Sequence, residues 1–418
     1  MMFRVLSTLK GLEQRHLPIF LISVLGLFYV AGNGSVFFAL PLIANSLVND
    51  LMIVGLLIAI PNFVSLFLDV PLGGLSDYLG RKKLLGSGLF MMGLLGIVLP
   101  TISTVPALIL FLVVFGIANQ LIYISVRAFI MDISPLNKTS EYFGFFEALA
   151  SIGFTIGPIV GGMLIADQLS IGVLSVGLFY FTMCLIALVI VFTLKETIPK
   201  EGLTSSIKDL IKKDKLIFRE LIEFKELRGP GAIILILTFI LVTADGLIWT
   251  MEPLFATLGL DTATVGLILA MFVVPFILFD VPAGYLADKI GKTKVMFIGL
   301  IIAGIFLISF GSTREPNLLL IFAFIATTGL ALVRPSVDGL LTDLAEQKHK
   351  GGIVGVWDVS EDLGYVIGPI LGGIIAEYYQ NIGVAFTAMG AILLLMAPLA
   401  LLTSKRKTKK EENLVITL

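Results

Sequence analysis

Apolar residues recur along the whole chain in runs of about 20, separated by short polar segments. A run of this length forms a helix that crosses a hydrocarbon layer of roughly 30 Å. The pattern therefore predicts membrane-spanning helices throughout, because only helices and closed barrels satisfy every backbone polar group in lipid. The twelve predicted spans are 18–43, 51–75, 84–102, 106–131, 141–166, 172–194, 231–256, 264–287, 294–312, 317–343, 352–378 and 382–403.

The polar positions repeat at a constant offset. Residues 69–83 read DVPLGGLSDYLGRKK, and residues 280–294 read DVPAGYLADKIGKTK, 211 residues later. The glycines between Gly144 and Gly162 return between Gly355 and Gly373 at the same offset. Two matches at one spacing indicate duplication of a whole half, related by an axis along the membrane normal. The predicted fold class is all-α integral membrane, with twelve transmembrane helices in two parallel six-helix bundles.

One long polar segment divides the halves. Residues 195–230 contain nine Lys or Arg and seven Asp or Glu among spaced apolar residues, a pattern typical of helices lying at a membrane surface. We predict an N-terminal six-helix bundle over 1–194, a partly amphipathic helical cytoplasmic linker over 195–230, and a C-terminal six-helix bundle with a basic cytoplasmic tail over 231–418.

Composition excludes several classes of protein. With 57% hydrophobic and 14% charged residues, the chain is too apolar for a soluble domain. The formal net charge of −1 points to no nucleic-acid partner, and the sequence holds no GxxxxGK[ST] phosphate loop. One cysteine and two histidines leave no metal site. We predict no enzymatic activity, no cofactor and no metal; the partners are membrane lipid and a small-molecule substrate, and the chain acts as a monomer.

Basic residues mark one side of the membrane. Most of the 29 Lys and Arg lie before the first span or in every second loop, and the alternate loops carry only Arg314. By the positive-inside rule, both termini are cytoplasmic, which requires an even number of crossings. The first span is too long for a cleaved signal, so we expect it to remain as the first helix. The predicted location is the plasma membrane, with multiple passes.

The repeated basic loops resemble a known signature. Gly73-x-Leu75-Ser76-Asp77-Tyr78-x-Gly80-Arg81-Lys82-Lys83, with its copy from Gly284 to Lys294, resembles the cytoplasmic loop motif of the major facilitator superfamily. The resemblance implies that each loop forms a charge relay with an acid at the end of the fourth or tenth helix. We therefore interpret two sets as cytoplasmic gate latches; the alternative is that they only satisfy helix ends. The sets are Asp77, Arg81 and Asp132, and Asp288, Lys292 and Asp343.

A glycine pattern in the fifth predicted helix narrows the resemblance. It is similar to the signature of drug–proton antiporters with twelve helices, although Leu112 stands where that pattern has an arginine. Small residues at these spacings flatten a helix face for close packing, which alone would explain both copies. The predicted packing residues are Gly153, Gly157, Pro158 and Gly161, with their copies Gly364, Gly368, Pro369 and Gly372.

Ionisable residues inside predicted spans cost about 2.5–3.5 kcal/mol on insertion scales, so they are expected to face a cavity or a partner. The deeper ones in the second half are Asp245, Arg334, Glu361 and Asp362. We predict that they carry protons or bind substrate near the middle of the membrane. The alternative is a structural pair between Arg334 and Asp362.

The first half holds neutral polar groups at similar depth. Asn33, Asn119 and Tyr123 are predicted to line the substrate surface through hydrogen bonds. Arg127 and Glu147 lie at similar depths on neighbouring predicted helices, so we predict a buried ion pair between them. Glu252-Pro253 is expected to interrupt the seventh helix near an outer gate.

The leading hypothesis is a secondary active transporter that works by alternating access and exports amphipathic or cationic small molecules in exchange for protons. An importer or facilitator of a neutral or anionic metabolite is the alternative within transport, with Arg334 and Arg127 as anion ligands. A receptor or lipid-handling protein that has kept the fold is the alternative outside transport.

Overall fold

The computed structural model describes residues 2–135, 138–165, 169–197, 230–345 and 350–403. Within this part of the chain, twelve helical segments are long and apolar enough to cross a membrane, and each coincides with a predicted span. The predicted linker lies almost wholly outside the described residues, so its amphipathic helices and the domain boundaries stay predictions.

The helices follow one another with short connections. They are α1 (Met2–Val48), α2 (Leu51–Leu79), α3 (Arg81–Val98), η1 (Leu99–Thr101), α4 (Val105–Ile133), α5 (Thr139–Ile165), α6 (Leu169–Thr193), α9 (Pro230–Met251), η4 (Pro253–Leu258), α10 (Thr262–Met271), α11 (Val274–Ile290), α12 (Lys292–Gly311), α13 (Pro316–Ala345), α14 (Lys350–Tyr378) and α15 (Ile382–Leu401). Helices α10 and α11 together make one membrane span, broken at Phe272 and Val273.

Local chemistry explains several helix ends. The Asp50 carboxylate accepts a hydrogen bond from the Ile53 backbone N–H at 2.9 Å and so caps α2. Gly80 and Gly291 adopt φ of 94° and 104°, a left-handed conformation that side chains disfavour, and each lets one helix follow another immediately. Pro253 has no N–H to continue α9, and the chain turns into η4.

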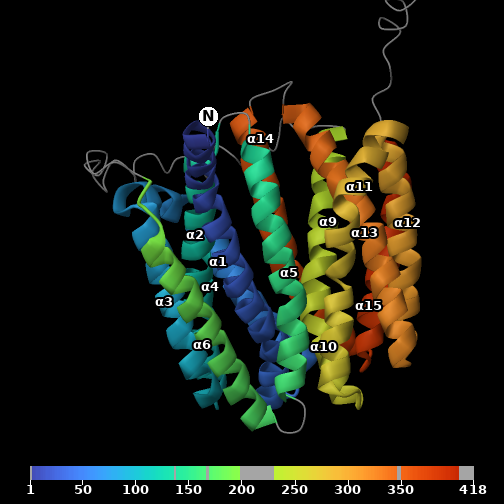
Figure 1. The fold of residues 1–418 in the computed structure, drawn as a ribbon. Helices are drawn as coiled ribbons and strands as arrows, with labels where there is room; N and C mark the ends of the chain where they lie inside the picture. Colours follow the sequence, from blue (N-terminus) through green and yellow to red (C-terminus); the bar gives the residue numbers. More distant parts are fainter. Residues whose placement is uncertain (1, 136–137, 166–168, 198–229, 346–349, 404–418) are drawn as a thin grey trace, which may run out of the picture.

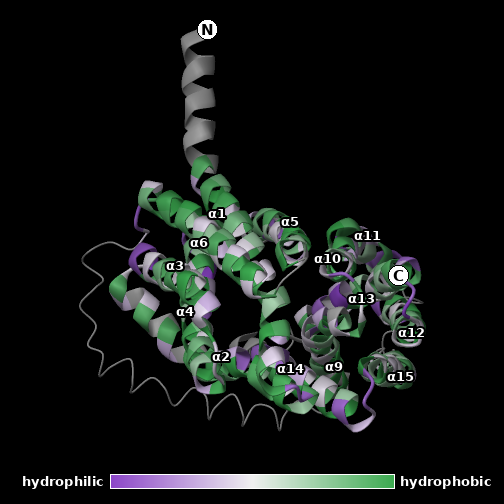
Figure 2. Ribbon diagram, turned by 90° about the horizontal axis from the view of Figure 1, so that it is seen from below, coloured by the Kyte–Doolittle hydropathy of each residue, from purple (hydrophilic) through white to green (hydrophobic). Residues whose placement is uncertain are grey.

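The helices form two bundles that lie side by side (Figure 1; Figure 2). Helices α1 to α6 make the N-terminal bundle and α9 to α15 make the C-terminal bundle. Two pairs of helices join them: α2 packs against α14, and α5 packs against α10. The predicted fold class, an all-α membrane protein of two six-helix bundles, is confirmed.

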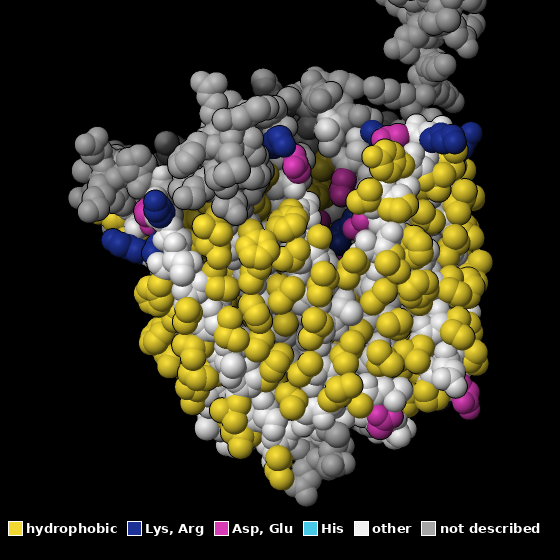
Figure 3. Space-filling model, in the orientation of Figure 1, with side chains coloured by type: hydrophobic (Ala, Val, Ile, Leu, Met, Phe, Trp, Pro, Cys, Tyr) yellow, Lys and Arg dark blue, Asp and Glu magenta, His cyan; other side chains and the backbone are white. Residues whose placement is uncertain are grey.

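The two ends of the bundles differ in charge, and we name them accordingly. The end at which α1 begins carries the described basic residues of the α2–α3, α4–α5, α6 and α11–α12 connections and is called the basic face (Figure 3). The other end is called the opposite face; among the described residues, the charged side chains there that are not buried are Asp50, Asp261, Arg314, Glu315 and Glu377.

The bundles touch most closely toward the opposite face. The Leu51 backbone N–H donates to the Glu377 carboxylate at 2.8 Å, and the Thr262 hydroxyl donates to the Gly162 carbonyl at 2.9 Å. A methyl group on Gly55 would collide with the Pro369 carbonyl oxygen. Since these contacts bring backbone against backbone, the space between the bundles is closed at the opposite face.

Candidate functional site

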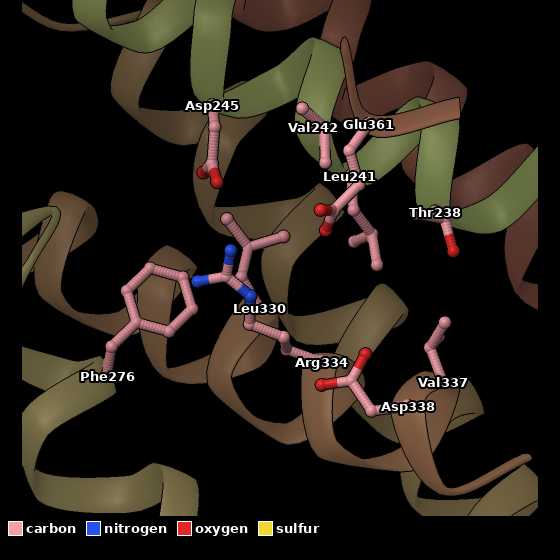
Figure 4. Close-up of a pocket in the computed structure, with 10 residues that line it drawn as sticks. All are labelled: Thr238, Leu241, Val242, Asp245, Phe276, Leu330, Arg334, Val337, Asp338 and Glu361. Atoms are coloured by element: carbon pink, nitrogen blue, oxygen red, sulfur yellow. The ribbon is translucent and has the colours of Figure 1, made fainter. Parts of the chain in front are cut away.

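A cavity lies inside the C-terminal bundle, and four helices supply its walls (Figure 4). Protein atoms leave about 400 Å³ unfilled there, in a space that is open on one side. The lining residues are Thr238, Leu241, Val242 and Asp245 of α9, Phe276 of α11, Leu330, Arg334, Val337 and Asp338 of α13, and Glu361 of α14.

Charged groups dominate the polar part of the cavity. Three carboxylates, those of Asp245, Asp338 and Glu361, surround the single guanidinium of Arg334 (Figure 4). The Arg334 Cζ lies 5.4 Å from the centre of the Phe276 ring, a cation–π contact. Among the described side chains, no carboxylate is within ion-pair distance of that guanidinium. The guanidinium and the carboxylates interact electrostatically without direct contact. Each of these groups therefore remains available to bind a ligand.

The cavity faces the basic face through the space between the bundles. Arg334 and Asp338 are exposed, and Tyr123 on α4 of the other bundle is 47% exposed, although all three belong to membrane-spanning helices. Figure 3 shows acidic and basic side chains in a hollow below the basic face. The site is therefore reached from the basic face in this conformation.

The structure brings three of the four predicted charged residues together. Asp245, Arg334 and Glu361 line the cavity, and Asp362 does not. Asp362 is seven residues before Pro369 and so lies on the side of α14 that packs against α2. Asp338, which lies 211 residues after Arg127, was not among the predicted site residues, yet it lines the cavity. Its spacing of four residues from Arg334 puts both on one helix face and was the available signal.

The neutral residues of the first half mostly pack inside their own bundle. Asn119 Oδ1 accepts hydrogen bonds from the Tyr29 hydroxyl and, at 3.5 Å, from the Asn33 amide. Asn33 is only 4% exposed, so it does not line the open space. Tyr123 does face that space, and the Arg127 guanidinium stacks over its ring at 4.8 Å.

The predicted buried ion pair between Arg127 and Glu147 is wrong for this conformation. No ion pair joins these two described side chains, and neither is buried. Arg127 contacts Tyr123 instead, and Glu147 is exposed in the space between the bundles, where the charge of Arg334 also acts on it. Both residues belong to the N-terminal bundle, so the directions of their side chains on α4 and α5 keep them apart.

The N-terminal gate residues form a connected group at the basic face. Arg81 Nε donates to the Asp132 carboxylate at 3.1 Å, and the Thr197 hydroxyl donates to the same oxygen at 2.7 Å. The Glu196 carboxylate accepts the backbone N–H groups of Arg81 and Lys82 at 2.9 and 3.2 Å, which caps α3. The first residues of the linker therefore bind the repeated loop.

The matching loop of the second half contacts α13. Lys292 Nζ donates to the Gly339 carbonyl at 3.0 Å, and Asp288 is exposed. The side chains of Asp77 and Asp343 lie outside the described residues. Whether the two sets act as latches stays a prediction.

The repeated glycines lie where helices touch. Gly153, Gly157 and Gly161 of α5 meet the backbone of α1, and a methyl group on Gly157 would lie 2.7 Å from the Ala31 carbonyl oxygen. Gly364 and Gly368 of α14 meet α9 in the same way, and Gly372 meets its side chains. Pro158 of α5 and Pro369 of α14 lie near these glycines. The Pro158 carbonyl faces α10 and the Pro369 carbonyl faces α2, in each case a helix of the other bundle.

Within the described part of the chain, no cluster of three or more His, Cys, Asp or Glu side chains is arranged to hold a metal ion. The chemistry of the cavity is that of carboxylates, one guanidinium and an apolar wall. Such groups bind protons and charged or amphipathic solutes.

Known proteins show the same sequence pattern. The chain matches the Major Facilitator Superfamily over residues 22–251 and again over residues 234–416. It is 26% identical over 318 residues to an uncharacterized MFS-type transporter of Methanocaldococcus jannaschii, covering 74% of this chain and 78% of that protein. It is also 26% identical over 171 residues to the quinolone resistance protein NorA of Staphylococcus aureus, 41% of this chain and 44% of NorA.

Solved structures share the fold at low sequence identity. A D-xylose–proton symporter superposes with a TM-score of 0.71 at 16% identity, covering 91% of this chain and 97% of its own. A bacterial homolog of the human lysosomal transporter Spinster, in an inward-facing and unoccupied conformation, superposes with a TM-score of 0.75 at 13% identity, covering 93% and 96%. The sequence match spans both bundles, and this chain belongs to the Major Facilitator Superfamily of membrane transporters.

Proposed function

We propose that the chain is a secondary active transporter that exports amphipathic or cationic small molecules in exchange for protons, by alternating access. The observation that carries this proposal is the cavity with three carboxylates and one guanidinium, open toward the basic face and closed toward the opposite face.

The charges of the cavity favour a cation. Asp245, Asp338 and Glu361 exceed the single positive charge of Arg334 unless protons neutralise some of them. A substrate cation and protons therefore compete for the same carboxylates, which is the physical requirement for exchange. Phe276, together with Leu241 and Leu330, supplies an apolar wall for the rest of an amphipathic molecule.

The joint between the bundles suits a rocking motion. Small residues let α2 meet α14 and α5 meet α10 backbone to backbone toward the opposite face. Opening that face would separate these pairs and bring the basic-face ends together, near Arg81 and Lys292. The latch role of those two residues belongs to this proposal.

The orientation is also part of the proposal. We place the basic face in the cytoplasm and the protein in the plasma membrane, because short loops rich in Lys and Arg stay on the cytoplasmic side. The similarity to NorA, whose name describes quinolone resistance, supports export, although it covers less than half of either chain.

Transport into inside-out vesicles with an imposed pH gradient tests the function. We expect a fluorescent lipophilic cation to accumulate when the lumen is acidic, and accumulation to fall about tenfold or more in Asp245→Asn and Glu361→Gln, since each removes a charged contact of about 1.5–3 kcal/mol. Glu141→Gln is the matched control, because Glu141 is exposed and pairs only with Lys138 at 3.1 Å. Transport that ignores the gradient for every substrate class would refute exchange.

One observation favours a second candidate, an importer or facilitator of an anionic metabolite. The Arg334 guanidinium is exposed in the cavity and, within the described side chains, has no carboxylate in ion-pair contact. The same vesicles with a panel of organic anions decide between the two, since an anion carrier loses transport in Arg334→Gln and retains it in Glu361→Gln.

A further inference from the structure

Glu252 is an acidic residue that the cavity does not use. It follows α9 directly, its side chain is 0% exposed, and neither carboxylate oxygen has a hydrogen-bond partner in the described structure. An isolated carboxylate anion is very costly to bury, because no water or donor compensates the charge. In this conformation the group is therefore stable only as the neutral carboxylic acid.

Glu252 lies next to the closed joint at the opposite face. Pro253 ends α9, and the following η4 packs against α1 of the other bundle. One turn earlier, the Trp249 ring lies 6.3 Å from the Phe37 ring and 4.9 Å from the Phe154 ring, both in the N-terminal bundle. Glu252 thus sits beyond this aromatic contact, where the bundles must part to open the opposite face.

The charged groups on the neighbouring elements have other partners. Arg314 stacks over Phe255 at 4.9 Å and donates to the Asn381 side chain at 2.8 Å. Glu377 of α14 accepts the Leu51 N–H, and Asp261, which precedes α10, accepts the Thr264 N–H at 2.8 Å. Glu315 is exposed.

The immediate sequence neighbours of Glu252 offer it no polar contact. Met251, Leu254 and Phe255 are all fully buried apolar side chains. No cation in the described structure neutralises Glu252, so a proton is the ligand that its surroundings allow.

We propose that Glu252 is a proton-binding site of the opposite-face gate, and that this gate closes only when the carboxyl carries a proton. The inference rests on the proposed alternating access and adds a regulatory site to it. On closing, the carboxylate takes one proton from water at the opposite face; on opening, the carboxylic acid returns that proton to the same water. The site is separate from Asp245 and Glu361, which face the cavity on the other side of the joint.

Distances between spin labels on the two bundles test the proposal. In a Cys184→Ala background, which removes the buried native thiol, one labelled pair is Ser103→Cys with Asn317→Cys at the opposite face. A second pair, Lys83→Cys with Lys294→Cys, reports on the basic face. All four positions are exposed.

Each proton coupled to closing changes the ratio of open to closed molecules about tenfold per pH unit. For the unmodified gate, we expect the opposite-face pair to separate as pH rises. Glu252→Gln keeps a neutral side chain of similar shape, and we expect this variant to stay closed at the opposite face. Its ratio of open to closed molecules should change by one factor of ten per pH unit less than that of the unmodified protein. Glu252→Met, also uncharged, gives the same result if the glutamine variant folds poorly. Glu315→Gln, an exposed acid at the same face, keeps the original slope.

The experiment distinguishes failure of the alternating-access proposal from failure of the Glu252 assignment. If neither labelled pair changes distance at any pH or with substrate, alternating access itself is refuted. If both pairs alternate and Glu252→Gln keeps the full pH dependence, the transport proposal survives and the assignment of Glu252 is overturned.

Discussion

The two bundles are built alike and charged differently. Asp50 caps α2 in the first bundle, and Asp261, 211 residues later, caps α10 in the second. The glycines of α5 and α14 pack against α1 and α9 in the same way. Positions that determine backbone packing have thus been retained in both halves, because a change there forces whole helices apart.

The polar positions of the halves have diverged. Arg334 stands where the first half has Tyr123, Asp338 where it has Arg127, Glu361 where it has Ala150, and Asp245 where it has Gly34. The cavity consequently lies in the C-terminal bundle, and Tyr123 of the N-terminal bundle is exposed toward the space between the bundles. The packing residues and the charged residues lie on different faces of the helices. The charged residues can therefore differ between the halves while the packing stays the same.

The largest expected difference is in transport, at the repeat pair Arg334 and Tyr123. Arg334→Gln leaves three carboxylates without their cation, and we expect loss of gradient-driven transport of about tenfold or more, because a charged contact contributes about 1.5–3 kcal/mol. Tyr123→Phe removes one hydroxyl at an exposed wall and should change transport by only about twofold. Equal losses of transport in the two variants would mean that both halves contribute equally to binding or coupling.

Packing should respond equally in both halves. Gly157→Ala places a methyl group against the Ala31 carbonyl, and Gly368→Ala places one against the Thr243 carbonyl. Overpacking of this kind costs about 1–3 kcal/mol, which a lower unfolding midpoint in detergent would report. Gly144→Ala is the control, since nothing lies within 4 Å of a methyl group there. A large effect in one half alone would contradict the equivalence.

The paired caps make a smaller, symmetric test. Asp50→Ala and Asp261→Ala should each lower stability by about 1 kcal/mol, the usual value of an N-cap, and thermal unfolding at neutral pH measures it. The capping hydrogen bond from Thr264 holds the pKa of Asp261 below its usual range. Its contribution is therefore complete above the ordinary pKa of about 4 and disappears as pH falls through the lower folded value. Unchanged unfolding of Asp261→Ala would show that the cap is unimportant.

The smallest expected effect concerns the basic loop of the N-terminal half. Glu196→Gln keeps an acceptor for the α3 N-terminus and removes its charge, at a cost of about 0.3–1 kcal/mol that salt reduces. Unfolding at low and high ionic strength measures the difference. Thr193→Val, an exposed site on α6 that does not contact this loop, is the comparison variant. An effect that is insensitive to salt would argue against a role of charge.

Much of this protein could be predicted before any coordinates. Apolar runs located all twelve spans, and the constant offset between DVPLGGLSDYLGRKK and DVPAGYLADKIGKTK predicted two equivalent bundles. Both predictions rest on strong local constraints: lipid demands long apolar helices, and close packing demands small residues at fixed spacings.

Partnerships between side chains on different helices could not be predicted in this way. Depth along a helix suggested a pair of Arg127 with Glu147 and, as an alternative, one of Arg334 with Asp362, and rotation about the helix axes decided otherwise. Sequence alone determined the number of spans, the duplication and the presence of charges in the second half. Only the tertiary structure decided that Asp338 joins Asp245 and Glu361 around Arg334, and that Glu252 is sealed without a partner, because these depend on which helix faces meet and which stay open to water.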